Sequence, residues 1–451
     1  MMFWSSALQV AAKMDSLRAA EQKLIDNFAY KFGRVHDSKD MYDVQIADTL
    51  IPRSSVPLKP ESSSSSWLFG SAASTEADAS LTMHSIHVRV KNDDDDNVHN
   101  ENNTSDTPLV IVHGYMNAAA YFYRNLIGLT HYFKKSGVYS VDLLGYGLSS
   151  RPDFSQLVDD SVETAEDFFV ESLEQWRRAQ NLPKMILAGH SLGGYLSVAY
   201  TERYPEHVER LVLLSPVGVP DDQDRQHKEW QERINSSYRT RAMVGVMRTM
   251  FKTTTPGSVL RSLSESRARG MINGYVERRL PEISDPAEQE AVSDYLFKTA
   301  ALPGSAEYCI SKFLNPTILA KNPLQNRIPL LKVPHVNFLY GGTDWMPVSA
   351  ALSTQQLCER TTGAPSVNVF VVPEAGHLLM LQNWDGFNAA VIHASGGKVP
   401  AGRLPIHMKP EEDRDFTIDD SRLNGLAVAR TAVEQLEQES RSHNSRPEVS
   451  V

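Results

Sequence analysis

Short apolar segments alternate with amphipathic ones along most of the chain after residue 80. Residues 81–90, LTMHSIHVRV, alternate apolar and polar side chains with the period of a half-buried strand. Shorter, nearly continuous apolar runs begin near residues 108, 138, 184, 208, 333 and 367, as in strands buried on both faces. Amphipathic segments such as residues 165–180 separate these runs. The alternation predicts an α/β fold with a mostly parallel central sheet flanked by helices.

Residues 7–28 form a separate amphipathic segment near the N-terminus. Their apolar side chains recur at helical spacing on one face, at Val10, Met14, Leu17, Leu24 and Phe28. Two interpretations remain open for this helix. It packs on the domain, or it anchors the protein in the interfacial region of a membrane.

The same pattern divides the chain into four parts. Residues 1–80 contain the N-terminal helix and a linker rich in Ser and Pro, and residues 81–220 together with 331–395 form the predicted core. Residues 221–330 lack a clear strand pattern and are predicted to form an inserted helical cap. Residues 396–451 are polar, charged and poor in aromatic side chains, which predicts a disordered tail.

Composition narrows the class of protein. Two cysteines in 451 residues are too few for a disulfide framework, and a net charge of −10 argues against general nucleic-acid binding. No apolar run approaches the roughly 18 residues expected of a membrane-spanning helix. The N-terminus lacks the basic region and long apolar core of a secretory signal. We therefore expect a cytoplasmic protein, with a mitochondrial location left open because the N-terminal segment is helical but poor in arginine.

The strongest chemical signal is the pattern G-x-S-x-G at residues 189–193, where an apolar run changes into a helical segment. In this pattern the serine occupies a sharp turn between strand and helix, and the crowded turn requires glycine at Gly189 and Gly193. Ser191 is the candidate nucleophile. His190, inside the turn, is interpreted as a packing and hydrogen-bonding residue.

A serine nucleophile needs a general base, and the base needs an acid that orients it. Asp344 and His377 follow Ser191 in the chain order expected for this arrangement, and each comes directly after a predicted strand. Because parallel strands present their carboxyl ends at one edge of the sheet, the three side chains are predicted to meet there.

Other acidic residues near the predicted strands are alternatives to Asp344 or have other roles. Asp221 and Asp222 follow an earlier strand and remain a minor alternative for the catalytic acid. Asp385 comes after His377, out of chain order, and is interpreted as a surface helix residue. Asp142 is interpreted as a structural cap of a turn.

The oxyanion of an acyl-transfer intermediate is expected to bind backbone N–H groups. Leu192, directly after the nucleophile, supplies one, and Tyr115 in the loop after the strand near residue 108 supplies the other. His113 and Gly114 form the tight turn that orients this loop. The reaction requires no metal and no cofactor.

Several segments together resemble a known family. They are residues 112–126, 139–154, 168–200, 253–263 and 339–347, and the similarity covers roughly residues 108–390 plus the early helix at 19–27. They are similar to the α/β-hydrolase branch of the lipid-droplet lipase coactivator and its N-acylphosphatidylethanolamine lipase sister, with plant phospholipase/acyltransferase and yeast cardiolipin deacylase relatives. The resemblance implies the α/β-hydrolase fold, a phospholipid or lysophospholipid substrate, and association with a membrane or lipid-droplet surface.

Two departures from that branch refine the expected activity. The coactivator carries Asn in place of the nucleophile, whereas this chain has Ser191 and resembles the hydrolytic members. The family's H-x4-D pattern, linked to acylation of lysophosphatidic acid, is altered here because Gln382 follows His377 at that spacing. We predict a serine hydrolase of (lyso)glycerophospholipid acyl esters that acts through an acyl-enzyme. The alternatives are an acyl-CoA-dependent lysophosphatidic acid acyltransferase and a non-catalytic scaffold that recruits a lipase.

The predicted cap is unusually basic. Residues 233–279 contain ten Lys or Arg and two Glu, a local charge of +8 in a chain of net −10. Positive charge near the site entrance suits an anionic phospholipid headgroup. The candidate headgroup-binding residues are Arg239, Arg241, Arg248, Lys252 and Arg261.

Overall fold

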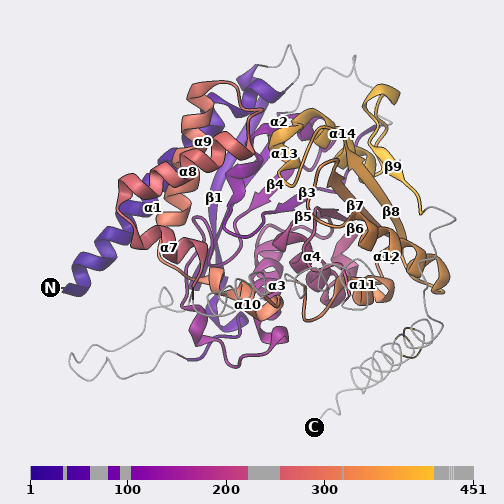
Figure 1. Ribbon diagram of the computed structural model, residues 1–451, viewed down its shortest axis with the longest axis horizontal. Helices are drawn as coiled ribbons and strands as arrows, with labels where there is room; N and C mark the ends of the chain where they lie inside the picture. The colour runs from indigo at the N-terminus through magenta and orange to yellow at the C-terminus, as the bar shows by residue number, and fades with distance from the viewer. Residues whose placement is uncertain are drawn as a thin grey trace, which may run out of the picture.

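One large mixed sheet organises the chain. The computed structural model describes residues 2–33, 38–60, 80–91, 103–221, 254–316, 319–410 and the single residues 426, 428 and 430. Within these ranges nine strands form the sheet in the order β1-β2-β4-β3-β5-β6-β7-β8-β9 (Figure 1). They are β1 Tyr42–Pro52, β2 Ser80–Val90, β3 Leu109–Val112, β4 Val138–Val141, β5 Met185–His190, β6 Val208–Leu214, β7 His335–Gly341, β8 Ser366–Val372 and β9 Ile406–Met408.

The centre of the sheet is parallel, which confirms the predicted fold class. Every neighbouring pair from β4 to β8 is parallel. The antiparallel pairs are β1 with β2, β2 with β4, and β8 with β9. A strand lies at each position where the apolar pattern predicted one. The carboxyl ends of the six parallel strands therefore meet at one edge of the sheet.

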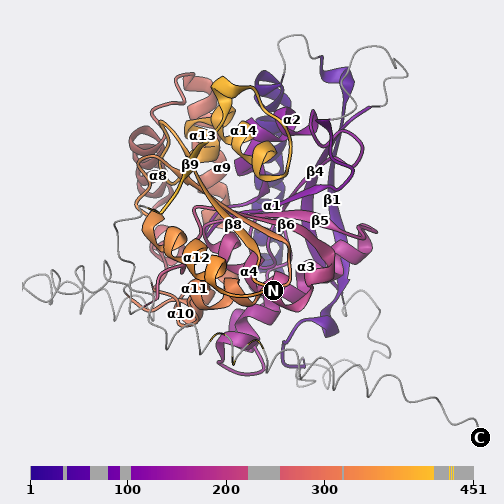
Figure 2. The same cartoon turned by 90° about the vertical axis from the view of Figure 1, so that its right-hand side faces the viewer.

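Helices cover both faces of this sheet (Figures 1 and 2). Trp176 of α3 and Tyr195 of α4 are buried in the core on one face, and Leu126 of α2 and Phe387 of α14 in the core on the other. Because both faces are covered, the central strands read as continuous apolar runs. The core helices are α2 Tyr123–Thr130, α3 Val162–Ala179, α4 Leu192–Arg203, α12 Val348–Arg360, α13 Leu379–Gln382 and α14 Trp384–Ala394.

The two outermost strands correct the predicted boundaries. Residues Tyr42–Pro52, assigned from sequence to the N-terminal helix and linker, form β1 and pair with β2 along its whole length. Residues Ile406–Met408, assigned to a disordered tail, form β9 on β8. Both are edge strands with many exposed residues. In β1, Tyr42, Val44 and Ile46 do alternate with polar residues, so the sequence carried a strand signal there that was not used. The three residues of β9 are too few to show a period.

The N-terminal helix α1 Met2–Asn27 packs on the domain over its second half. Leu17 and Leu24 are buried, as is Phe28 just after the helix, in contact with the core that also contains Tyr295. The helix lies beside the cap helix α9 Pro286–Ala301 in Figure 1. Leu8, nearer its start, is 67% exposed.

Among the helices that the structure describes, none combines the length and apolar character needed to cross a lipid bilayer.

The described part of the predicted cap is helical. It contains α7 Pro256–Ser262, α8 Glu265–Arg279, α9 Pro286–Ala301, α10 Ile310–Phe313 and α11 Leu324–Arg327. The helix α9 packs against α1 at one side of the sheet, and α7 and α8 pack on α9 (Figure 1).

A buried ionic cluster joins α1 to the sheet. His84 of β2 is fully buried, and its two ring nitrogens lie 2.8 Å from Glu21 Oε1 and 2.6 Å from Asp48 Oδ1. Burial lowers the pKa of His84, but the two carboxylates outweigh burial and raise it to about 10. Asp142 adds to this effect from the sheet side, while Arg18 pairs with Asp48. His84 is therefore an imidazolium at neutral pH.

The cluster predicts a pH dependence of stability. Since the pKa of His84 is raised in the folded state above 6.5, its contribution is complete below that pH and is lost as pH rises through about 10. We expect the free energy of unfolding to fall between pH 7 and 10 by on the order of 2 kcal/mol more in the wild type than in His84→Gln. Urea unfolding at the two pH values measures the difference.

His87 on the same strand is the matched control. Burial lowers the pKa of His87 to about 4, so it stays neutral throughout this window. His87→Gln should keep the wild-type pH dependence. Equal losses in the wild type and in His84→Gln would contradict the assignment of charge to His84.

Candidate active site

Ser191 occupies the turn between β5 and α4, where strand changes to helix within one residue. Its backbone angles, φ 53° and ψ −113°, are rarely adopted by residues other than glycine. Its N–H donates to Leu214 O at 2.9 Å, and its carbonyl accepts from Gly194 N at 3.0 Å and Val217 N at 3.2 Å. This conformation is the one expected of a nucleophile elbow, which presents the serine hydroxyl above the strand ends.

The two glycines of the motif allow the close approach that this turn requires. A Cβ at Gly189 would lie 2.3 Å from Gly193 O and 2.4 Å from Ser197 Oγ. A Cβ at Gly193 would lie 2.5 Å from the backbone oxygens of Val112 and His113 at the end of β3. Contacts this short are not seen for real side chains, so α4 can start here only if both positions are glycine.

Asp344 and His377 come together at the ends of the neighbouring strands β7 and β8. His377 Nδ1 lies 3.2 Å from Asp344 Oδ1, and the Asp344 side chain is fully buried. With Nδ1–H donated to the carboxylate, Nε2 of the neutral imidazole is the nitrogen that accepts a proton. Since β5, β6, β7 and β8 are consecutive neighbours in the sheet, the turn at Ser191 lies at the same edge.

The acid has further hydrogen-bond donors that sequence reasoning missed. Ser215, directly after β6, donates its hydroxyl to Asp344 Oδ2, and Met346 N donates to Oδ1 at 3.0 Å. Burial raises the pKa of Asp344, but the hydrogen bonds from His377, Ser215 and Met346 outweigh burial and hold it below 3.8. Asp344 is therefore ionised at neutral pH. The signal in the sequence that could have indicated Ser215 is its position directly after the predicted strand that begins near residue 208.

The loop after β3 lies on the other side of β5. His113 donates from Nδ1 to Gly114 O at 2.8 Å and accepts from Leu143 N at Nε2 at 3.1 Å, which fixes its tautomer. Tyr115 donates its hydroxyl to Glu307 O of the cap at 2.9 Å. At Leu192 the backbone N–H belongs to the first turn of α4, where N–H groups have no partner within the helix. The oxyanion roles of Leu192 and Tyr115 remain predictions.

His190 is buried beside the catalytic candidates. Its Nε2 donates to the backbone carbonyl of His377 at 2.9 Å. Burial and the neighbouring His377 lower the pKa of His190 to about 3, so its imidazole is neutral. These contacts fit the interpretation of His190 as a supporting residue behind the turn.

The rival acidic residues lie elsewhere or have other partners. Asp385, at the start of α14, pairs with Arg403. Asp221 Oδ2 accepts from Asn326 Nδ2 at 3.1 Å, and Asp222 lies outside the described residues.

Asp142 has the structural role inferred from sequence. It accepts the backbone N–H groups of Ala119 at 2.5 Å and Leu148 at 2.7 Å. Burial raises its pKa to about 6.

Of the five basic candidates for headgroup binding, Arg261 is the one that lies within the described residues. Arg261 forms an ion pair of 2.6 Å with Glu307, so its charge is compensated. Arg239, Arg241, Arg248 and Lys252 lie outside the described residues. The sequence could not indicate the ion pair because Glu307 is 46 residues away along the chain.

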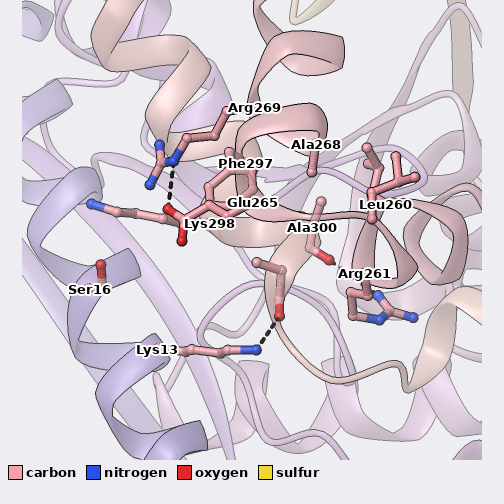
Figure 3. A pocket seen from close by; sticks show the side chains of 12 residues that line it. Lys13, Ser16, Leu260, Arg261, Glu265, Ala268, Arg269, Phe297, Lys298 and Ala300 are labelled. Carbon is pink, nitrogen blue, oxygen red and sulfur yellow. Dashed lines mark hydrogen bonds and ion pairs between the residues drawn. The ribbon is translucent and has the colours of Figure 1, made fainter.

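Arg261 lines a cavity of about 370 Å³ between α1 and the cap helices (Figure 3). The other basic side chains that line the cavity also have partners. Arg269 pairs with Glu265 at 2.8 Å, Lys298 with Asp294 at 2.7 Å, and Lys13 donates to Ala301 O at 3.2 Å. The cavity thus offers little uncompensated positive charge.

Trp345 is an exposed aromatic residue at the site that sequence reasoning did not single out. It directly follows Asp344, its ring centroid lies 5.2 Å from that of His377, and it is 51% exposed. Its place beside the candidate base positions it for contact with whatever enters the site.

Comparison with known proteins gives a consistent set of matches. The family model described as alpha/beta hydrolase fold matches residues 107–383. The 1-acylglycerol-3-phosphate O-acyltransferase of Arabidopsis thaliana is 33% identical over 291 residues, which cover 63% of this chain and 66% of the plant protein. The chain thus spans just under two thirds of that relative's length.

Two mammalian relatives also match the chain. The 1-acylglycerol-3-phosphate O-acyltransferase ABHD5 of Rattus norvegicus is 31% identical over 301 residues, covering 64% of this chain and 77% of the relative. The (lyso)-N-acylphosphatidylethanolamine lipase of Mus musculus is 30% identical over 250 residues, covering 54% of this chain and 67% of the relative.

The close contact of Gly193 with the end of β3 predicts that a larger residue at this position destabilises the fold. Gly193→Ala should lower the free energy of unfolding by about 1–3 kcal/mol, because the methyl group must displace backbone atoms of β3. Gly270→Ala on α8 is the control, since no described atom lies within 4 Å of its Cβ position. Alanine there should stabilise by roughly 0.5–1 kcal/mol through helix propensity. Urea unfolding measures both, and an unchanged Gly193→Ala would contradict the contact.

Proposed function

The chain belongs to the α/β hydrolase fold family, and from this membership we propose that it is a serine hydrolase of (lyso)glycerophospholipid acyl esters. The observation that carries the proposal is the 3.2 Å contact between His377 Nδ1 and Asp344 Oδ1, at the sheet edge that also holds the strained turn at Ser191. Relatives named as acyltransferases and as a lipase, from plants and mammals, confirm the resemblance to the branch identified from sequence.

The proposed reaction begins at Ser191. Its Oγ attacks the acyl carbonyl while His377 Nε2 takes the hydroxyl proton. Asp344 keeps the proton of His377 on Nδ1 and stabilises the imidazolium that forms. The negative oxygen of the tetrahedral intermediate accepts hydrogen bonds from the N–H groups of Leu192 and Tyr115.

The second half of the reaction releases the products. Collapse of the intermediate breaks the ester bond, and the leaving alcohol takes the proton from His377. A water molecule then gives a proton to His377 and attacks the acyl-enzyme, which releases the fatty acid and regenerates Ser191. His377 accepts and returns the proton in each half of the reaction, so the proposed mechanism uses no metal or cofactor.

The substrate class is supported by the relatives. The names of the three relatives refer to acylglycerol phosphate and to N-acylphosphatidylethanolamine, which are both lipids with a phosphate group. We therefore propose a phospholipid or lysophospholipid as substrate. Because such lipids lie in membranes, we also propose that the protein works from the cytoplasm at a membrane or lipid-droplet surface. The exposed Trp345 beside His377 suits an amphiphilic substrate, since indole combines a large apolar surface with one N–H donor.

A second function, acyl transfer to lysophosphatidic acid, is favoured by the names of the plant and rat relatives. The same acyl-enzyme would form, and the hydroxyl group of lysophosphatidic acid would replace water as the acyl acceptor. Gln382 stands where the H-x4-D pattern has Asp, which argues for hydrolysis. The scaffold alternative is opposed by an intact serine at the strained turn.

An activity-based probe tests the nucleophile. A fluorophosphonate should add one phosphonyl group to the wild-type protein and none to Ser191→Ala, as measured by intact-protein mass spectrometry. Asp344→Asn should slow the reaction by about 10⁴-fold, because the histidine then holds the wrong tautomer. Asp385→Asn, which removes an acid of similar size from an ion pair outside the site, should label at the wild-type rate.

The outcome also separates the hydrolase from the scaffold. No adduct on folded wild-type protein, with detergent or lipid present, would contradict the hydrolase proposal. Equal rates in Asp344→Asn and the wild type would remove Asp344 from the proposed triad.

Product analysis separates hydrolysis from acyl transfer. With lysophosphatidylcholine as substrate, we expect free fatty acid as the product, dependent on Ser191. With labelled acyl-CoA and lysophosphatidic acid, we expect less than one tenth as much phosphatidic acid as fatty acid. Dominant phosphatidic acid would instead favour the acyltransferase.

A further inference from the structure

Gln382 links the loop of His377 to the cap. It is the last residue of α13, and its side-chain Oε1 accepts the backbone N–H of Gly376 at 2.8 Å. Its Nε2 donates to the carbonyl oxygen of Arg279, the last residue of cap helix α8, at 3.1 Å. One amide group therefore contacts the residue before His377 and the end of a cap helix at the same time.

The chemistry of both contacts selects an amide. A glutamine side chain offers an acceptor and two donors, whereas a carboxylate only accepts and an ammonium group only donates. The carbonyl of Arg279 belongs to the last turn of α8, where carbonyl groups have no partner within the helix. At Gly376, a Cβ would lie 3.3 Å from Gln382 Oε1, so glycine leaves the space that this amide occupies.

The rest of the His377 loop is held by the core. Thr343 N donates to Ala375 O at 2.9 Å, and His190 Nε2 donates to His377 O at 2.9 Å. These contacts fix the backbone on both sides of Gly376. Among these contacts, the one through Gln382 also reaches a described helix of the cap.

We propose that Gln382 is a positioning residue that sets the His377 loop in its active geometry only while cap helix α8 is docked. This inference rests on the proposed role of His377 as the general base. When α8 is in place, its carbonyl orients the Gln382 amide so that the oxygen faces Gly376 N–H. When α8 moves away, the amide loses that orientation and the loop loses one tether.

The consequence concerns the order of events in catalysis. A substrate that displaced α8 on entering under the cap would remove this orientation, and return of α8 would restore the loop. A displacement of about 1 Å at a catalytic group can lower a rate by roughly 100-fold. The coupling thus makes turnover depend on cap closure, with little effect on how tightly a small substrate binds.

Three variants test the proposal with a soluble short-chain ester, p-nitrophenyl butyrate. Gln382→Met removes both hydrogen bonds and should lower kcat by roughly 10-fold to 100-fold while KM changes less than twofold. Gln382→Glu keeps the acceptor for Gly376 N–H and loses the donor to Arg279 O. Because a carboxylate accepts through either oxygen, it holds Gly376 N–H without being oriented by α8, and it should recover most of the kcat that Gln382→Met loses.

Asn383→Ala is the matched control. Asn383 donates to Pro373 O at 2.9 Å at the start of the same loop and accepts from Gly386 N at 2.9 Å, and neither partner belongs to the cap. Its removal loosens the loop without affecting the tether to α8. We expect its kcat to stay within twofold of the wild type. A kcat loss equal to that of Gln382→Met would contradict a specific role for Gln382.

Hydrogen exchange tests the tether independently of activity. The amide of Gly376 should exchange slowly in the wild type and Gln382→Glu, and at least tenfold faster in Gln382→Met. Peptides that cover the end of α8 should exchange faster in both Gln382 variants. Unchanged exchange at both places would overturn the proposal, even if the wild type proved inactive.

The kinetic results keep the two proposals apart. A wild type without Ser191-dependent hydrolysis would contradict the proposed function. An active wild type with an unchanged kcat in Gln382→Met would contradict the positioning role alone.

Discussion

The strained turn at Ser191 is the constraint on which the candidate site depends. Its positive φ persists because α4 begins immediately, against the end of β3, and this is sterically allowed only with glycine at Gly189 and Gly193. The same approach puts the first turn of α4, which begins with the N–H of Leu192, at the strand edge. Strain at one residue, tight packing of a helix on the sheet, and an exposed hydroxyl are therefore one structural feature.

Sheet order then decides which side chains can join Ser191. The strands β5, β6, β7 and β8 are consecutive neighbours, and each is followed by a residue of the site. Ser215, after β6, donates to the carboxylate of Asp344, after β7, and Asp344 accepts from His377, after β8. The buried carboxylate stays ionised because its hydrogen bonds outweigh the cost of burial. The parallel sheet thus supplies both the positions and the electrostatic balance of the acid.

The cap contacts the core at both loops that border the site. On one side, Tyr115 donates its hydroxyl to Glu307 O, and on the other, Gln382 donates to Arg279 O. Both acceptors are backbone carbonyls of the cap, so both contacts depend on the position of the cap and not on the identity of its side chains. Arg261 was expected to attract an anionic headgroup. It instead forms an ion pair with Glu307 within the cap. The described part of the cap therefore contributes backbone contacts to the loops of the site, and not free positive charge.

The sequence by itself determined the parallel core of the sheet and the candidate chemistry. Buried strands read as short apolar runs, and the elbow at Ser191 requires glycines at fixed spacing, so both are encoded within a few neighbouring residues. Asp344 and His377 were found because each directly follows such a strand. Only the tertiary structure decided β9, which is too short to show a pattern, and the full length of β1, whose pairing with β2 continues beyond the alternation of residues 42–46. It also decided the pairing of Arg261 and the bridge through Gln382, because contacts between residues about 50 to 100 positions apart leave no local signal.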